Sequence, residues 1–150
     1  VLSQLINGAN EELLIVSFVV FNIPEILSLL KEALLRGVKI TCIFESPEES
    51  QGKITFQGFD AFNEDILKQI KILIWEKEMR PVNTDGKFGT LHAKCAVADR
   101  RVSFISSANL TINAMTLNME LGLLIYDENV AQEIVDHFEH LTVNGVLRVR

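Results

Sequence analysis

The stretch Leu13-Leu14-Ile15-Val16-Ser17-Phe18-Val19-Val20 is a nearly unbroken apolar run with several β-branched members. Charged residues precede this run, and Asn22-Ile23-Pro24 follow it. A continuous apolar run of this length predicts a strand that is buried on both faces. It therefore predicts a sheet that is covered on both sides.

The residues after this strand predict how the chain returns to the sheet. Asn22 is suited to cap a helix and Pro24 to occupy its first turn, so we expect an amphipathic helix over 23–36, ended by Gly37. The run 38–44 predicts a second buried strand. A strand, a helix and a strand with short joints form a right-handed crossover, which places the two strands parallel.

The remaining pattern completes an α/β domain. We expect a mixed, centrally parallel β-sheet flanked by helices on both faces. The expected elements are a lead helix within 1–10, a loop over 45–59, a helix over 60–69, a strand over 71–75, a long polar connection over 76–89, strands over 91–98 and 102–106, a short helix or loop over 108–117, a strand over 119–126 and a closing helix over 129–141.

Length and composition favour one globular domain over 1–150, because 48% hydrophobic residues are enough for a single core. The net charge of −6 argues against a broad nucleic-acid surface, although a local basic cluster could override it. The sequence lacks signal-peptide features and long apolar spans, so we expect a cytoplasmic protein without membrane association. Cys42 and Cys95 lie in apolar runs, which favours reduced thiols without excluding a disulfide. Val1 stands where Met would start a chain, which suggests a domain excised from a longer protein.

Candidate chemistry is concentrated in the motif Leu91-His92-Ala93-Lys94-Cys95-Ala96-Val97-Ala98-Asp99. If 91–98 is one strand, His92 and Lys94 share a face with Ala96 and Ala98, whose small side chains leave room for a ligand. The opposite face would then pack against a helix. The same alternation in the later strand groups Asn118, Glu120 and Gly122.

These residue types are suited to phosphate chemistry. A neutral imidazole of His92 can attack phosphorus, and a carboxylate such as Glu120 can orient the ring. Lys94 supplies a positive charge and Asn109 an amide for the non-bridging oxygens, while Ser107 adds a hydroxyl. We see no carboxylate cluster and no His/Cys spacing typical of a metal site, so no metal or other cofactor is expected.

The pattern His92-x-Lys94-x-x-x-x-Asp99, with Ser107-x-Asn109 and Glu120 after it, resembles the signature of the phospholipase D superfamily. The resemblance implies a phospholipase D-like fold and a double displacement through a phosphohistidine. One departure is Ser106, where the family usually has Gly. It raises the question of whether this position needs a left-handed backbone, which only Gly adopts freely.

The family mechanism uses two histidines, and this chain has one such motif. His137 and His140 lie on the closing helix without a Lys two residues later, so they do not form a second copy. Single-motif members of the family dimerise through the site, and by analogy we expect a homodimer in which both His92 side chains face one pocket. Such a pair should titrate as a unit and give a bell-shaped pH profile.

Structural alternatives exist for several of these residues. Asp99 sits at the corner of an expected hairpin, and we favour a supporting role for it over direct catalysis. Asn109 could instead cap the segment after it. Glu120 lies between apolar residues and needs a partner, for which His92 is the first choice. We therefore predict His92, Lys94, Asn109 and Glu120 as catalytic, with Asp99 and Ser107 in support.

The preferred hypothesis is a metal-independent nuclease, because the small single-motif members that this chain resembles tend to be nucleases. The motif around Cys95, the segment Ser107-Ala108-Asn109-Leu110-Thr111 and the ending Gly145-Val146-Leu147 also resemble the phospholipase D-like component of DISARM-type anti-phage systems. That resemblance would add other defence proteins as partners. The alternatives are a phospholipid hydrolase or phosphatidyltransferase, and a non-catalytic nucleic-acid-binding module of a defence complex.

Overall fold

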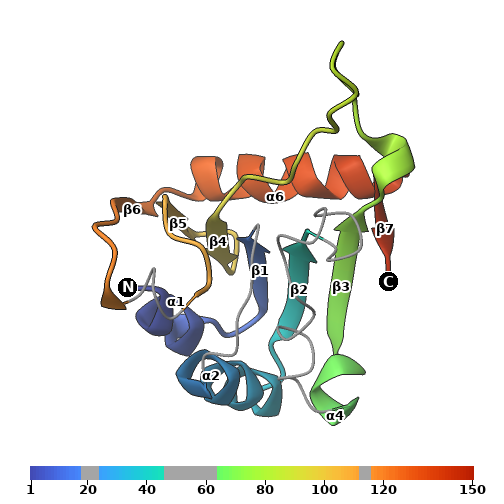
Figure 1. The fold of residues 1–150 in the computed structure, drawn as a ribbon. Helices are drawn as coiled ribbons and strands as arrows, with labels where there is room; N and C mark the ends of the chain where they lie inside the picture. Colours follow the sequence, from blue (N-terminus) through green and yellow to red (C-terminus); the bar gives the residue numbers. More distant parts are fainter. Residues whose placement is uncertain (18–23, 46–63, 112–115) are drawn as a thin grey trace.

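The computed structural model describes residues 1–17, 24–45, 64–111 and 116–150, and its ribbon is shown in Figure 1. The predicted fold class is confirmed. The helices are α1 (Leu2–Gly8), α2 (Pro24–Leu35), α4 (Glu64–Leu67), the 3₁₀ helix η2 (Lys77–Met79) and α6 (Glu128–Val143). The strands are β1 (Glu12–Ser17), β2 (Lys39–Phe44), β3 (Ile70–Trp75), β4 (Cys95–Ala98), β5 (Val102–Ser106), β6 (Gly122–Tyr126) and β7 (Leu147–Val149).

The strands form one seven-stranded sheet in the order β6-β5-β4-β1-β2-β3-β7. Strands β1, β2 and β3 are parallel to one another, as the strand–helix–strand pattern predicts. Strands β4, β5 and β6 add antiparallel pairs on one side, and β7 adds one on the other. The parallel centre brings the carboxyl ends of three buried strands to one edge, which is where ligands bind in sheets of this kind.

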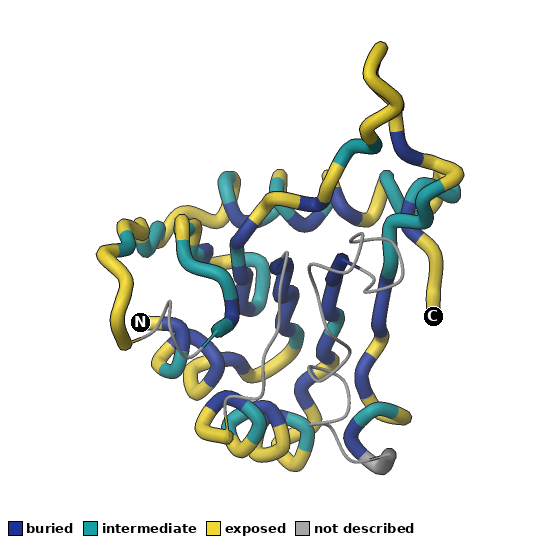
Figure 2. The backbone as a smooth tube through the Cα atoms, viewed as in Figure 1, coloured by how far each residue is buried: buried dark blue, intermediate teal, exposed yellow. Residues whose placement is uncertain are grey.

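Each face of the sheet carries its own apolar core. In Figure 2 the buried positions, in dark blue, follow the central strands and recur along the helices that cover them. On one face α1 and α2 pack over β1, β2 and β4, with Ile6, Leu30 and Ile15 among the most buried side chains. On the other face α6 packs through Val135 and Phe138. Apolar side chains of β1 alternate between the two cores, so the predicted burial on both faces is confirmed for 13–17, the described part of the predicted run.

Two predicted strands begin later than expected. Strand β4 starts at Cys95 instead of Leu91, because its pairing with β1 ends where Val16 meets Cys95. Strand β6 starts at Gly122 instead of Met119, where it pairs with Ser106. The Asn22 cap, the loop over 46–59 and parts of the helices predicted over 60–69 and 108–117 lie outside the described residues.

The β4–β5 hairpin is closed by a left-handed turn. Asp99 and Arg100 have φ angles of 53° and 52°, and the Arg101 N–H donates to the Ala98 carbonyl at 3.0 Å. Positive φ at both central residues matches the twist of paired strands, and Asp tolerates this conformation better than most residues.

The Asp99 carboxylate ties this hairpin to the start of β1. It accepts hydrogen bonds from the backbone N–H groups of Asn10, Glu11 and Glu12, at 2.8 to 3.2 Å. Burial acts to raise the pKa of Asp99, but these backbone donors outweigh it and hold the pKa below the usual 3.8.

We predict that Asp99→Asn lowers the free energy of unfolding at pH 7 by about 1–3 kcal/mol, because backbone donors lose a charged acceptor. The folded-state pKa of Asp99 is depressed, so its stabilisation is present above the unfolded pKa and is lost as the pH falls through the folded one. Urea denaturation of both proteins between pH 7 and pH 2 should show the difference shrinking below pH 4. A constant difference across that range would contradict this role.

Candidate active site

The motif crosses the edge of the sheet where the parallel strands end. In Figure 1 the chain leaves the upper end of β3, projects from the body and runs back across the sheet edge to enter β4. Lys94 directly precedes β4, and Ser107 directly follows β5. The two strands are antiparallel neighbours, so these residues come together at one end of the hairpin.

Lys94 is a buried cation. Its side chain folds back so that Nζ donates to the His92 carbonyl oxygen at 2.8 Å, and its own carbonyl accepts from the Ser106 N–H at 3.1 Å. Lys94 is buried whereas the His92 side chain is exposed, so the prediction that both share one strand face is wrong. The reason is that 91–94 has no place in the strand ladder, and side-chain alternation does not apply there.

A cavity of about 240 Å³ lies beside Lys94. Its lining includes Lys94, Ala96, Ser106 and Asn109 together with the end of β1 and the first residues of the chain. Ala96 lines this space as predicted, whereas Ala98 does not, and both alanines pack into the α1/α2 core. In the described part of the chain, the buried Oδ1 of Asn109 has no hydrogen-bond partner, which leaves it available to a bound group.

Glu120 is held by two side chains. Ser107 Oγ donates to its Oε2 at 2.5 Å, and Asn118 Nδ2 donates to its Oε1 at 3.1 Å. The predicted hydrogen bond from His92 to Glu120 is not among the hydrogen bonds of this carboxylate within the described residues, and it stays a prediction. Ser107 also accepts from the Leu121 N–H at 3.1 Å, so it fixes the segment that carries Glu120.

The charges of Lys94 and Glu120 influence each other. Hydrogen bonds from Ser107 and then Asn118 lower the pKa of Glu120, burial opposes them, and the nearby Lys94 lowers it further. Burial lowers the pKa of Lys94, and the charge of Glu120 acts in the opposite direction. Glu120 therefore helps to keep a buried ammonium protonated beside the cavity.

Ser106 does not need the backbone freedom of glycine. Among the described non-glycine residues only Asp99 and Arg100 have positive φ, so Ser106 has an ordinary strand conformation. Its Oγ accepts from the Ala108 N–H at 3.0 Å and shapes the turn that leads to Asn109.

Sequence reasoning missed two charged residues, Glu45 and Arg80. Their side chains are 0% and 1% exposed, and they form an ion pair with each other. Glu45 directly follows the buried run of β2 without a polar turn between them, which was a signal for a functional acid at a strand end. Arg80 lay in a stretch interpreted as a polar connection. Ser17 is a further missed residue: it is the one polar side chain of its apolar run, and its Oγ accepts from the Leu110 N–H at 3.3 Å.

The described residues contain no group of three or more His, Cys, Asp or Glu side chains arranged to hold a metal. In the same residues, no helix combines the length and apolar character that crossing a bilayer requires. Both cysteines are free, and burial raises the pKa of Cys95, which lines the cavity, to about 11.

The fold and the site together define a phospholipase D-like domain. A family model described as the PLD-like domain of cardiolipin synthase matches residues 2–142, so the chain belongs to this family.

Known proteins resemble the chain at low identity. A cardiolipin synthase of Clostridium perfringens is 27% identical over 136 residues, covering 90% of this chain and 26% of that protein. The DISARM protein DrmC of Bacillus paralicheniformis is 24% identical over 132 residues, covering 87% of this chain and 50% of that protein. The crystal structure of Nuc, a phospholipase D family member from Salmonella typhimurium, superimposes with a TM-score of 0.74 at 19% identity, covering 99% of this chain and 87% of that one. This chain thus spans about a quarter of the cardiolipin synthase.

We predict that Glu120→Gln lowers the pKa of Lys94 further, because burial remains while the compensating negative charge is removed. NMR titration of the Lys94 side-chain carbons in both proteins measures the change. Glu128→Gln is a matched control, since Glu128 pairs with Arg101 at the opposite end of the hairpin. An unchanged or raised Lys94 pKa in Glu120→Gln would refute the coupling.

Proposed function

We propose that the domain is a metal-independent phosphodiesterase that cleaves nucleic acid through a phosphohistidine on His92, with its site shared by two copies of the chain. The observation that carries this proposal is the set of contacts that Lys94 makes beside the cavity. Lys94 and Asn109 line the same space, Lys94 Nζ is anchored on the His92 backbone, and Glu120 is coupled electrostatically to Lys94. A buried cation and an amide on one cavity, with an exposed imidazole two residues before the cation, are suited to a phosphate diester.

The proposed reaction has two displacements. In the first, a ring nitrogen of one His92 attacks phosphorus, the bond from phosphorus to the leaving oxygen breaks, and the second copy's His92 gives its proton to that oxygen. In the second displacement, the imidazole of the second copy's His92 removes a proton from water, and the resulting hydroxide displaces the first His92 from phosphorus. Lys94 and Asn109 bind the non-bridging oxygens in both steps.

The relatives support a second candidate, phosphatidyl transfer. The matching family model is described by cardiolipin synthase, and the cardiolipin synthases match along 90% of the chain. Phosphatidyl transfer would use the same phosphohistidine with an alcohol in place of water. The nucleic-acid assignment is preferred for a single-motif chain, and the similarity to DrmC supports a role beside other defence proteins.

Purified protein in excess chelator should cleave single- or double-stranded DNA and leave phosphatidylglycerol vesicles intact. His92→Ala should lose on the order of 10³-fold of the activity, because the nucleophile is removed. His140→Ala is the matched control, since this exposed histidine lies on α6, and it should keep wild-type activity. Turnover of phosphatidylglycerol alone would establish the second candidate, and absence of turnover on all substrates would favour a binding module.

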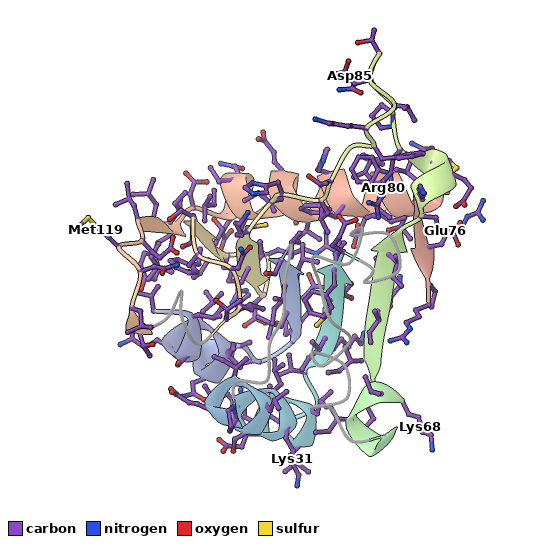
Figure 3. The ribbon with its side chains drawn as sticks, in the orientation of Figure 1. Lys31, Lys68, Glu76, Arg80, Asp85 and Met119 are labelled. Carbon is purple, nitrogen blue, oxygen red and sulfur yellow. The ribbon has the colours of Figure 1, made fainter. Side chains whose placement is uncertain are left out.

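An exposed apolar patch adjoins the site and supports the homodimer. Leu117, Met119, Leu121 and Leu123 are 63% to 102% exposed, and Glu120 lies between the middle two. Met119 projects away from the body of the molecule in Figure 3. Ile105 extends the patch, since it pairs with Leu123 across the strands β5 and β6. Strand β6 is an edge of the sheet, and 121–126 has no charged residue to discourage pairing with another chain.

We predict that Leu121→Glu gives a monomer in analytical ultracentrifugation and lowers phosphodiesterase activity about 100-fold or more, because the second histidine is lost. Leu35→Glu is the matched control: Leu35 is 80% exposed against 78% for Leu121, but it lies at the end of α2. The control should remain dimeric and active. A Leu121→Glu protein that is monomeric and fully active would exclude the shared site.

A further inference from the structure

The buried ion pair of Glu45 and Arg80 lies at the carboxyl ends of β2 and β3. Arg80 Nη1 contacts Glu45 Oε1, and the guanidinium Nε donates to the Trp75 carbonyl oxygen at 3.0 Å. Nη1 also donates to the Gly89 carbonyl at 3.4 Å. Figure 3 shows Arg80 where the chain leaves β3. The guanidinium thus joins the end of β3 to the segment that returns toward the motif.

The second oxygen of Glu45 contacts the motif itself. Oε2 accepts a hydrogen bond from the Leu91 N–H at 2.7 Å, one residue before His92. The Leu91 side chain is buried in the α6 core beside Val97. The carboxylate and the core therefore fix Leu91 from two directions.

The hydrogen bond between Glu45 and the Leu91 N–H holds a segment that has no strand partner. Residues 89–94 belong to no strand, yet they carry His92, so hydrogen bonds outside the sheet must determine the position of its backbone. One such bond is made by Lys94 Nζ on the far side of His92, and the other by Glu45 on the near side. Burying two charges is expensive, and a pair retained at such a place often holds a geometry that apolar residues could not.

We propose that Glu45 is a positioning residue for His92. Its carboxylate is paired with Arg80 and accepts a hydrogen bond from the Leu91 N–H. This hydrogen bond fixes the backbone next to His92 and thereby the position of the imidazole relative to Lys94 and the cavity. The expected effect of Glu45 on the reaction rate rests on the proposed function, whereas its expected effect on the position of His92 does not. Misplacing a nucleophile by about 1 Å costs on the order of 100-fold in rate.

Two substitutions separate positioning from stability. Glu45→Leu removes the acceptor for the Leu91 N–H, while Glu45→Gln keeps an amide oxygen that can still accept it. With bis(4-nitrophenyl) phosphate as a simple diester, Glu45→Leu should lower kcat about 100-fold with KM little changed, and Glu45→Gln should recover about tenfold of that loss. Asp127→Asn is the matched control, because Asp127 also accepts from backbone N–H groups, at the start of α6.

NMR of the same proteins without substrate tests positioning independently of activity. In Glu45→Gln the Leu91 amide should exchange about tenfold faster and the His92 ring signals should shift, while the amides of β1 keep wild-type rates. Unchanged Leu91 and His92 signals with only a lower Tm, or the same changes in Asp127→Asn, would overturn the proposal. If the wild type cleaves neither this diester nor DNA, the proposed function fails, and the NMR result alone decides the role of Glu45.

Discussion

The structure depends on the burial of β4 on both faces. Ala96 and Ala98 pack into the α1/α2 core, while Cys95 and Val97 pack toward α6, and the strand is paired on both edges with β1 and β5. A strand enclosed in this way cannot shift by one residue without exchanging its two faces. The spacing of the motif follows from this burial, because Lys94 and Asp99 flank the four strand residues. Lys94 lines the cavity, while Asp99 lies about 16 Å away at the other end of the strand.

Each buried charge at the candidate site is accompanied by an opposite charge, which offsets the cost of removing it from water. Lys94 is buried beside the negative charge of Glu120, and Glu120 is in turn held by Ser107 and Asn118. Glu45 and Arg80 neutralise each other behind the motif. The exposed imidazole of His92 is thus carried by a backbone with polar anchors on either side, and preorganisation of this kind is what phosphoryl transfer requires of a protein.

The fold was largely predictable because its strongest signals are local. The unbroken apolar runs of β1 and β2 and the amphipathic helix between them give the parallel centre of the sheet, and the spacing of His92, Lys94 and Asp99 gives the family. The start of β4 was not predictable, since Leu91 alternates with polar residues as a strand would, and only the end of the β1 partner stops the ladder at Cys95. The Glu45–Arg80 pair was missed because its members lie 35 positions apart, each within a stretch that resembles a loop.

We propose that the imidazole of His92 forms a covalent bond to phosphorus, and trapping this intermediate is the decisive experiment. The protein is mixed with an oligonucleotide that is ³²P-labelled at its internal phosphates or with a labelled phospholipid, quenched in alkali within one turnover and digested for mass spectrometry. We expect an alkali-stable, acid-labile phosphoryl adduct on the peptide that contains His92, and no such adduct in His92→Ala. Efficient turnover with no adduct on any residue, or with an adduct on a residue other than His92, would contradict it.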